Sequence, residues 1–318
     1  MPAMDYLLSK SEAWLQYCIR VNLLREDKEK LTDLKAEALR DNKIKSYLAG
    51  AADFHGVLVS NHKNPDLPIH KLLFLLDIGL DMSVPEIKAA TDEIMKHKDE
   101  CGVFQSLANI PKHYGGMGED IYGWCLCDSP LLLLALVKAG CPYEEHVKQG
   151  VDHLVGLSQA QGFPCTVSRE HGKFRGPGRK DDCCPYATLA MLRLLAEIPE
   201  YRDTELTDRT IDAILSLWEN SLEKHPYMFY MGTDFRKLKA PAIWYDIVGV
   251  ADCLSKFAHA RQDHRFREMT GIIADKRDGD GLFTPEAVYQ KCKDWDFGQK
   301  KAPSPYLTFL CVRILERM

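Results

Sequence analysis

The chain has 318 residues, of which 46% are hydrophobic, and its formal net charge is −5. This length allows a large core, and the mildly acidic balance argues against nucleic-acid binding. The first ten residues lack the features of a secretory signal, and the longest apolar run, Pro130–Val137, is far too short for a membrane span. With eleven cysteines and no export signal, the sequence predicts a cytoplasmic protein with reduced thiols.

The N-terminal part differs from the rest of the chain. The stretch REDKEKLTDLKAEALRDNKIKSYLAG, which begins at Arg25, is highly charged and predicts helix. We expect residues 1–52 to form a helical segment that packs on a repeat domain spanning residues 53–318.

The repeat domain follows one plan five times. An irregular stretch rich in glycine and aromatic residues leads to a proline and then to an apolar helix. Proline is favoured at the first position of a helix, because its missing N–H has no partner there in any case. The aligned prolines are Pro68, Pro130, Pro185, Pro241 and Pro305 (or Pro303), with spacings of 62, 55, 56 and 64 residues. A mean of about 59 residues is typical of a helical-hairpin repeat with a long loop.

More polar, amphipathic helices are predicted between the apolar ones. They are SVPEIKAATDEIMKHK from Ser83, PYEEHVKQGVDHLVGLS from Pro142 and TDRTIDAILSLWENS from Thr207. A helix that is apolar all round must be buried on every side, whereas an amphipathic helix covers the core with one face. A ring with the apolar helices inside and the amphipathic ones outside satisfies both patterns. Since no stretch alternates with a period of two, the sequence predicts an all-α fold.

The third repeat carries a family resemblance. Its sequence GKFRGPGRKDDCCPYATLAMLRLLA, from Gly172, resembles a repeat unit of the α/α-toroid superfamily, which includes class II squalene and terpene cyclases and protein prenyltransferase β subunits. The fifth repeat, from Gly281, is a looser match, and the shared plan extends over residues 54–318. The resemblance implies a toroid of helical hairpins, and here we expect a compact branch of it. The cyclases' D-x-D-D motif is absent, and the sequence does not place the prenyltransferases' Asp/Cys/His zinc set.

Basic residues gather just before three of the apolar helices. The N-termini of these helices would meet at one rim of a toroid, where they attract anions by themselves. Added cations therefore predict a site for an anionic group above an apolar cavity, although solvated loop charges are the alternative. The residues are Arg175, Arg179, Lys180, Arg236, Lys237, Lys239, Lys300 and Lys301.

Asp246 is the strongest candidate for acid–base chemistry. The pattern places it inside an apolar helix beside Trp244 and Tyr245, where burial would raise its pKa. A structural ion pair or a helix cap is the alternative role, and it also suits Asp182. The predicted catalytic residues are Asp246, Tyr245 and Asp182. The predicted substrate-binding residues are Arg179, Lys180, Tyr230, Arg236, Lys237, Lys239, Trp244, Trp295, Lys300 and Lys301.

Cysteines precede two of the apolar helices, as Cys125 and Cys127 and as Cys183 and Cys184. Because C-x-C and C-C lack the usual spacing of zinc ligands, we expect no metal or other cofactor. The alternative is a zinc ion held by Cys127, Asp182 and Cys184. A cysteine nucleophile is a further option, but the sequence places no histidine beside it. The histidine expected to face the cavity is His225, because aromatic residues surround it.

Together these features predict an enzyme that acts by acid–base chemistry on a small, largely apolar substrate with an anionic or polar head. The reaction would be an isomerisation, a cyclisation, an elimination or a prenyl-type transfer. The alternative is a non-catalytic helical-repeat module that binds a ligand or a protein. The expected partner is a small molecule, with no nucleic acid and no membrane span, and the sequence leaves the oligomeric state open.

Overall fold

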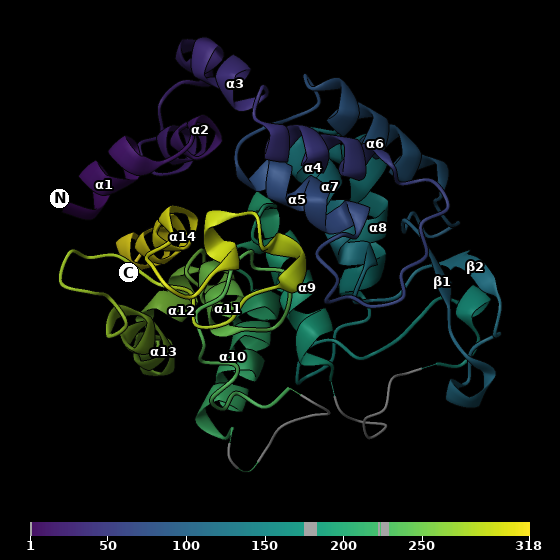
Figure 1. Ribbon diagram of the computed structural model, residues 1–318. Coiled ribbons are helices and arrows are strands. Elements are labelled where there is room, and N and C mark those ends of the chain that lie inside the picture. Colours follow the sequence, from purple (N-terminus) through teal and green to yellow (C-terminus); the bar gives the residue numbers. More distant parts are fainter. Residues whose placement is uncertain (1, 175–182, 222, 224–228) are drawn as a thin grey trace.

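The computed structural model describes residues 2–174, 183–221, 223 and 229–318, and this part of the chain is predominantly helical (Figure 1). The prediction of a mainly α-helical chain is confirmed at that level. Within these ranges no helix is both long enough and apolar enough to cross a membrane. An antiparallel pair of short strands, β1 (Ser106–Asn109) and β2 (Asp120–Gly123), departs from the prediction, because four residues are too few to show an alternating pattern.

The five apolar helices pack on one another in chain order. They are α5 (Pro68–Asp77), α7 (Ser129–Ala139), α9 (Pro185–Leu195), α11 (Ile247–Leu254) and α14 (Pro305–Glu316). Each contacts the next: α5 packs on α7, α7 on α9, α9 on α11, and α11 on α14. Phe74 of α5 also meets Tyr306 of α14, with ring centroids 5.3 Å apart. The succession of contacts therefore returns to its starting helix.

Amphipathic helices cover these inner helices from outside. They are α6 (Pro85–Lys96), α8 (Lys148–Val155), α10 (Glu205–Glu219), α12 (Ala258–Gln262) and α13 (His264–Ala274), and a turn of π-helix (Tyr143–Val147) precedes α8. α6 and α8 pack on α7, α10 packs on α9, and α13 packs on α11 and α14. In α10, Ile211, Ile214 and Trp218 are buried, as the spacing of apolar residues on one helix face requires.

The N-terminal helices lie against the first and last inner helices. They are α1 (Pro2–Lys10), α2 (Ala13–Asn22), α3 (Thr32–Ala38) and α4 (Asn42–Ala52), at the purple end of Figure 1. α1 and α2 pack on α14, and α4 packs on α5 and α6. The buried ring of Trp14 lies 5.6 Å from Phe74, 5.6 Å from Tyr306 and 5.3 Å from Trp295, measured between centroids. Large aromatic side chains thus join this segment to the ring of inner helices.

One repeat proline does not begin a helix. Pro68, Pro185 and Pro305 open their helices and Pro130 lies in the first turn of α7, but Pro241, which follows a cis peptide bond, lies ahead of α11. α11 begins at Ile247, because the side chain of Asp246 accepts a hydrogen bond from the N–H of Gly249 (2.9 Å) and caps the helix. The predictions that Pro241 starts this helix and that Asp246 lies inside it are therefore wrong.

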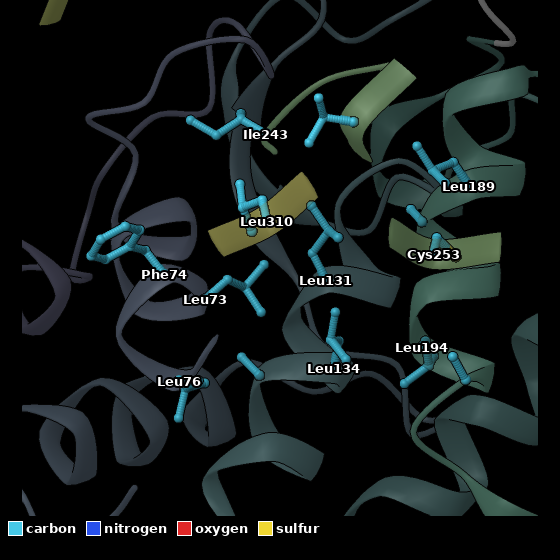
Figure 2. Close-up of a cluster of buried hydrophobic side chains, with 14 of the residues drawn as sticks. Leu73, Phe74, Leu76, Leu131, Leu134, Leu189, Leu194, Ile243, Cys253 and Leu310 are labelled. Atoms are coloured by element: carbon cyan, nitrogen blue, oxygen red, sulfur yellow. The ribbon is translucent and has the colours of Figure 1, made fainter. Parts of the chain in front are cut away.

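The five apolar helices share an apolar layer and a layer of charged side chains. Figure 2 shows Leu73 of α5, Leu131 of α7 and Leu310 of α14, all buried, pointing into a shared core. Each of the five apolar helices also carries a charged side chain towards its C-terminal end. In chain order these residues are Asp77, Lys138, Arg193, Asp252 and Arg313. Two pairs of these residues are in direct contact, at 2.8 Å each: Lys138 with Asp77, and Arg313 with Asp252.

Candidate functional site

Three polar side chains meet where the chain enters α5 and α7. His62 lies in the loop before α5, whereas Cys127 and Asp128 directly precede α7, with Asp128 at its N-cap. Nε2 of His62 is 3.4 Å from Sγ of Cys127, and Nδ1 is 2.7 Å from Oδ1 of Asp128. The imidazole ring thus stands between a thiol and a carboxylate.

Short contacts with the inner helices hold both loops in place. His70, buried in the first turn of α5, forms a hydrogen bond through Nε2 with the carbonyl oxygen of His62 (2.9 Å). Because that oxygen only accepts, Nε2 of His70 carries the proton. The backbone N–H groups of Asp128 and Ser129 donate to the carbonyl of Cys125 (2.9 and 3.0 Å), which forms the turn into α7. The three side chains are therefore positioned by helix entries rather than by a long flexible loop.

Charge and burial set the protonation of this cluster. Burial is the largest single influence on the pKa of His62 and lowers it, but Asp128 and Cys127 together outweigh burial and hold that pKa well above the usual value. Contact with the thiol of Cys125 and burial raise the pKa of Cys127 well above that of an ordinary thiol. Nδ1 makes no well-aligned hydrogen bond among the described residues, so its contact with Asp128 is an ion pair. Both shifts favour the protonated forms, the imidazolium of His62 and the thiol of Cys127.

A cavity of about 320 Å³ opens beside the cluster. Its lining residues are Val59, Ser60, His62, Ala108, Asn109, Ile110, Pro111, Tyr114, Cys125, Cys127, Asp128 and Phe174. The far wall comes from the end of β1 and the turn after it, so the unpredicted hairpin helps to form the cavity. Ligand pockets span about 300–1,000 Å³, which makes this one suitable for a small ligand.

A second thiol pair lies at the entry of α9. An antiparallel bridge pairs Pro164 with Cys183, which places Cys165 and Cys184 on the same face of the two segments. Contact with Cys165 lowers the pKa of Cys184 to about 7.

The side chains that could hold a metal ion near these cysteines differ from the zinc ligands considered from the sequence. Among the described residues of this region, His62, Cys127 and Asp128 bring three ligand atoms within 4.8 Å of one another, and Cys184 is not part of that set. The zinc alternative from the sequence also needs Asp182, which lies outside the described residues. The three grouped side chains are thus the ones that could hold a metal ion here.

Asp246 lies in a buried group of its own. Oδ1 caps α11, whereas Oδ2 is buried without a hydrogen-bond partner among the described residues. Burial raises the pKa of Asp246 to about 6. Nζ of Lys239 lies 3.3 Å from the centroid of the Tyr289 ring, and burial lowers the pKa of this lysine. The hydroxyl of Tyr245 is also buried and has no hydrogen-bond partner in the described part of the chain.

Aromatic rings connect the two buried groups. The ring of Tyr186 is 6.4 Å from that of His62 and 4.2 Å from that of Trp244, measured between centroids. Nζ of Lys63 lies 4.9 Å above Trp244. Since Trp244 shortly precedes Asp246, both groups lie at the N-terminal ends of the inner helices.

The remaining predicted side chains lie in other places. Arg236 stacks on the ring of Trp218 at 4.8 Å, and Nζ of Lys237 pairs with Asp234 at 2.5 Å. Trp295 is packed in the aromatic core beside Trp14. Lys300, Lys301 and Tyr230 are exposed. Five further predicted residues lie outside the described part of the chain: Arg175, Arg179, Lys180, Asp182 and His225. The structure therefore brings Lys239, Trp244, Tyr245 and Asp246 together, and the binding and catalytic roles remain predictions.

Sequence reasoning did not single out His62. It is 65 residues from Cys127, and the surrounding SNHKNP matches no catalytic motif. The repeat alignment could have indicated His62, because His62 and Cys127 both lie just before an aligned proline. Residues at such positions are expected at the same rim of the ring.

Comparisons with known proteins identify no family for this chain. No protein-family model matches the sequence, and a search of curated proteins finds no match. Among solved structures, a protein from Actinoplanes is similar over 99% of this chain and 97% of its own length, with 13% identity and a TM-score of 0.45. That similarity is too low to support an argument about function.

Proposed function

We propose that this protein is an enzyme that uses the thiol of Cys127 as a nucleophile towards a small acyl substrate. The observation that carries the proposal is the placement of the His62 imidazole between the Cys127 thiol and the Asp128 carboxylate. A nucleophile, a base within reach of it and a third group that orients the base are the elements of nucleophilic catalysis. A reactive thiol also suits the reducing, cytoplasmic location that the sequence predicts.

The proposed reaction proceeds in two steps. In the first, neutral His62 takes the thiol proton on Nε2 while Sγ of Cys127 bonds to the acyl carbon. The proton then passes to the leaving group as its bond to that carbon breaks, leaving a thioester. In the second, a water attacks the thioester, His62 accepts the water proton, and it returns a proton to Sγ as the acid leaves. Asp128 remains a carboxylate throughout and stabilises the imidazolium.

The cavity indicates the substrate class. Val59, Ile110 and Phe174 offer apolar contacts, and Ser60 and Asn109 add polar groups. Its volume of about 320 Å³ suits a short acyl chain with one polar end. This agrees with the expectation of a largely apolar substrate with a polar head.

A metal ion is the competing occupant of the cluster. A zinc ion would bind one ring nitrogen of His62, and the sulfur of Cys127 and the carboxylate of Asp128 would both have to lie near that same nitrogen. Here the two partners face different ring nitrogens, which favours a proton relay over a metal site. A cobalt-loaded sample with a thiolate-to-metal absorption that Cys127→Ser removes would assign the cluster to a metal instead.

We further propose that the inner helices form an α/α toroid like those of the terpene cyclases and prenyltransferase β subunits. The closed succession of contacts from α5 to α14 and back supports this arrangement. The resemblance of the third repeat supports it as well. The fold alone does not supply the reaction, because the same architecture hosts unrelated functions.

Acid–base catalysis by Asp246 is the second candidate. Its buried, unpartnered Oδ2 and a pKa raised to about 6 suit a general acid or base at neutral pH. Lys239 lies near enough to act on its charge. The cavity described above includes neither residue, so we rank Asp246 behind Cys127.

The test uses short aliphatic p-nitrophenyl esters. We expect a burst of p-nitrophenolate followed by slower turnover, and an acyl group on the peptide that contains Cys127. Cys127→Ala should abolish both signals, and His62→Gln should lower the acylation rate by at least about 100-fold. Cys101→Ala, which changes a cysteine outside the cavity, serves as the matched control and should behave as wild type.

Two results would contradict the proposal. If Cys127→Ala keeps the turnover and Asp246→Asn removes it, the reaction belongs to the Asp246 group. If no ester reacts and no acyl group is found on Cys127, the alternative of a non-catalytic binding module is favoured.

A further inference from the structure

A second group of metal-ligand side chains lies at the end of α6, away from the cysteines. Glu93 is in the last turn of α6, His97 is the residue that ends it, and His55 comes from the loop after α4. Oε1 of Glu93 is 2.9 Å from Nδ1 of His55 and 3.6 Å from Nε2 of His97. All three ligand atoms lie within 4.8 Å of one another.

These separations suit a transition-metal ion. Nitrogen and oxygen ligands lie about 2.0–2.2 Å from zinc, so two of them at a tetrahedral angle are about 3.3–3.6 Å apart. The separation of 3.6 Å lies at the upper end of that range, whereas the separation of 2.9 Å is a hydrogen bond between His55 and Glu93 that has to lengthen slightly to admit the ion. Nζ of Lys96 contacts the other carboxylate oxygen, Oε2, at 2.6 Å, which leaves Oε1 as the ligand atom.

The side chain of His97 is fixed in place, and its Nε2 has no hydrogen-bond partner among the described residues. Its ring stacks on Tyr122 of β2, with centroids 3.8 Å apart and planes at 4°. Its carbonyl oxygen accepts a hydrogen bond from the N–H of Gln105 (2.9 Å), so backbone and ring are both fixed. Nε2 is nonetheless buried and without a hydrogen-bond partner among the described residues. A buried ring nitrogen without a partner costs free energy, and a bound ion would remove that cost.

We propose that His55, Glu93 and His97 form a binding site for a divalent transition-metal ion such as Zn²⁺, with a coordination position left open to water. Two imidazoles and one carboxylate are a ligand set that zinc takes in proteins. From the sequence we expected no metal, with zinc at Cys127, Asp182 and Cys184 as the alternative, so a site at His55, Glu93 and His97 revises that expectation.

The ion would fasten the loop between α4 and α5 to the end of α6. His55 is the exposed partner in this site, because its side chain is 84% exposed whereas that of Glu93 is 12% exposed. The same loop continues to His62, so an ion at His55 restrains the segment that supplies the imidazole of the candidate site. The metal site itself does not depend on the function proposed for Cys127.

The test measures zinc binding to the full chain. The protein is treated with a chelator, dialysed and titrated with ZnCl₂ by calorimetry, and CoCl₂ serves as a spectroscopic probe of the ligands. We expect one tight site per chain and a cobalt spectrum without thiolate-to-metal absorption. His55→Ala and Glu93→Gln should each weaken zinc binding at least tenfold. Because His55 is exposed, its substitution leaves the fold intact.

Two controls separate this site from other zinc ligands. His146→Ala changes another exposed histidine beside a glutamate, Nε2 to Oε2 of Glu145 at 3.7 Å, and should bind zinc as wild type does. Cys127→Ser should also bind as wild type does. The proposal is overturned if the wild type binds no zinc, or if His55→Ala and Glu93→Gln bind it unchanged. It is likewise overturned if Cys127→Ser alone removes the binding, a result that would place the ion at His62 and count against the proposed nucleophile too.

Discussion

At the scale of single residues, the protonation of His62 decides when the proposed enzyme works. The Asp128 carboxylate raises the pKa of His62, and only the neutral imidazole can take the thiol proton. The acylation rate should therefore rise with pH and still be rising above neutral pH. Replacing Asp128 removes the charge that raises this pKa.

Asp128→Asn should thus move the rising limb of the pH profile towards lower pH while lowering the maximal rate. The measurement is kcat/KM for a p-nitrophenyl ester between about pH 5 and about pH 9, a range that spans ordinary and raised histidine pKa values. A limb that stays in place in Asp128→Asn would show that His62 is not the titrating base.

Arg236 offers a second test at the residue scale, because the sequence predicts an anion-binding role for it. Its guanidinium stacks on Trp218. We expect Arg236→Gln to lower the free energy of unfolding by about 0.5–1 kcal/mol, the usual size of an exposed cation–π contact. Turnover of the ester should be unchanged. An unchanged or higher melting temperature together with tenfold weaker substrate binding would favour the anion-site hypothesis.

At the scale of elements, α11 shows how one capping residue sets a helix boundary. A proline ahead of an apolar run predicts a helix that starts at the proline, but the carboxylate of Asp246 caps the helix at a later residue. The other aligned prolines mark their helices well, because no competing cap follows them. Helix type and order were therefore predictable from the sequence, whereas this boundary depended on a side-chain contact.

In the candidate site, too, some features were predictable from the sequence pattern and others depend on contacts that only the structure shows. The repeat plan indicated which loops meet at one rim, and it identified the cysteines before α7. It could not pair Cys127 with His62, because that pairing needs the turn at Cys125 and the hydrogen bond from His70. Local sequence patterns thus predicted which residues precede each helix, but they did not predict contacts between loops that are distant in sequence.

The cap of α11 also yields a stability prediction. Burial raises the pKa of Asp246 from its ordinary value of 3.8 to about 6. Between these values the native state binds more protons than the unfolded state, so the free energy of unfolding falls as pH rises through this window. Asn is as good a helix cap as Asp and carries no charge.

Asp246→Asn should therefore raise the free energy of unfolding by about 1–3 kcal/mol at about pH 8, because the charged form no longer has to be buried, and change it little at about pH 4. Urea unfolding at the two pH values measures this difference. A loss of stability at both values would mean that the carboxylate is stabilised by a partner. If Asp246 is also the acid or base, kcat should fall more than the affinity for substrate.

At the scale of the whole molecule, partly buried ion pairs between neighbouring apolar helices tie the repeats to one another. A lone charge near the end of an apolar run looks like a solvent-facing helix terminus, so this layer was not predicted from the sequence. In the folded chain Asp77 faces Lys138 across α5 and α7, and Asp252 faces Arg313 across α11 and α14. Because each pair needs its partner helix in register, the layer favours one arrangement of the ring over alternatives of equal hydrophobicity.

The last prediction concerns Arg313, whose side chain is 9% exposed and whose Nη2 lies 2.8 Å from Oδ1 of Asp252. Arg313→Met should lower the free energy of unfolding by about 1.5–3 kcal/mol, because it removes one of the two arginines that contact Asp252 and leaves only Arg317, at 3.0 Å. Adding Asp252→Asn should restore part of the loss, since it removes the charge left behind. The matched control is Lys88→Met, which breaks an exposed pair with Asp92 and should cost no more than about 0.5 kcal/mol. Equal effects of the two single substitutions in urea unfolding would show that the buried charges do not hold the helices together.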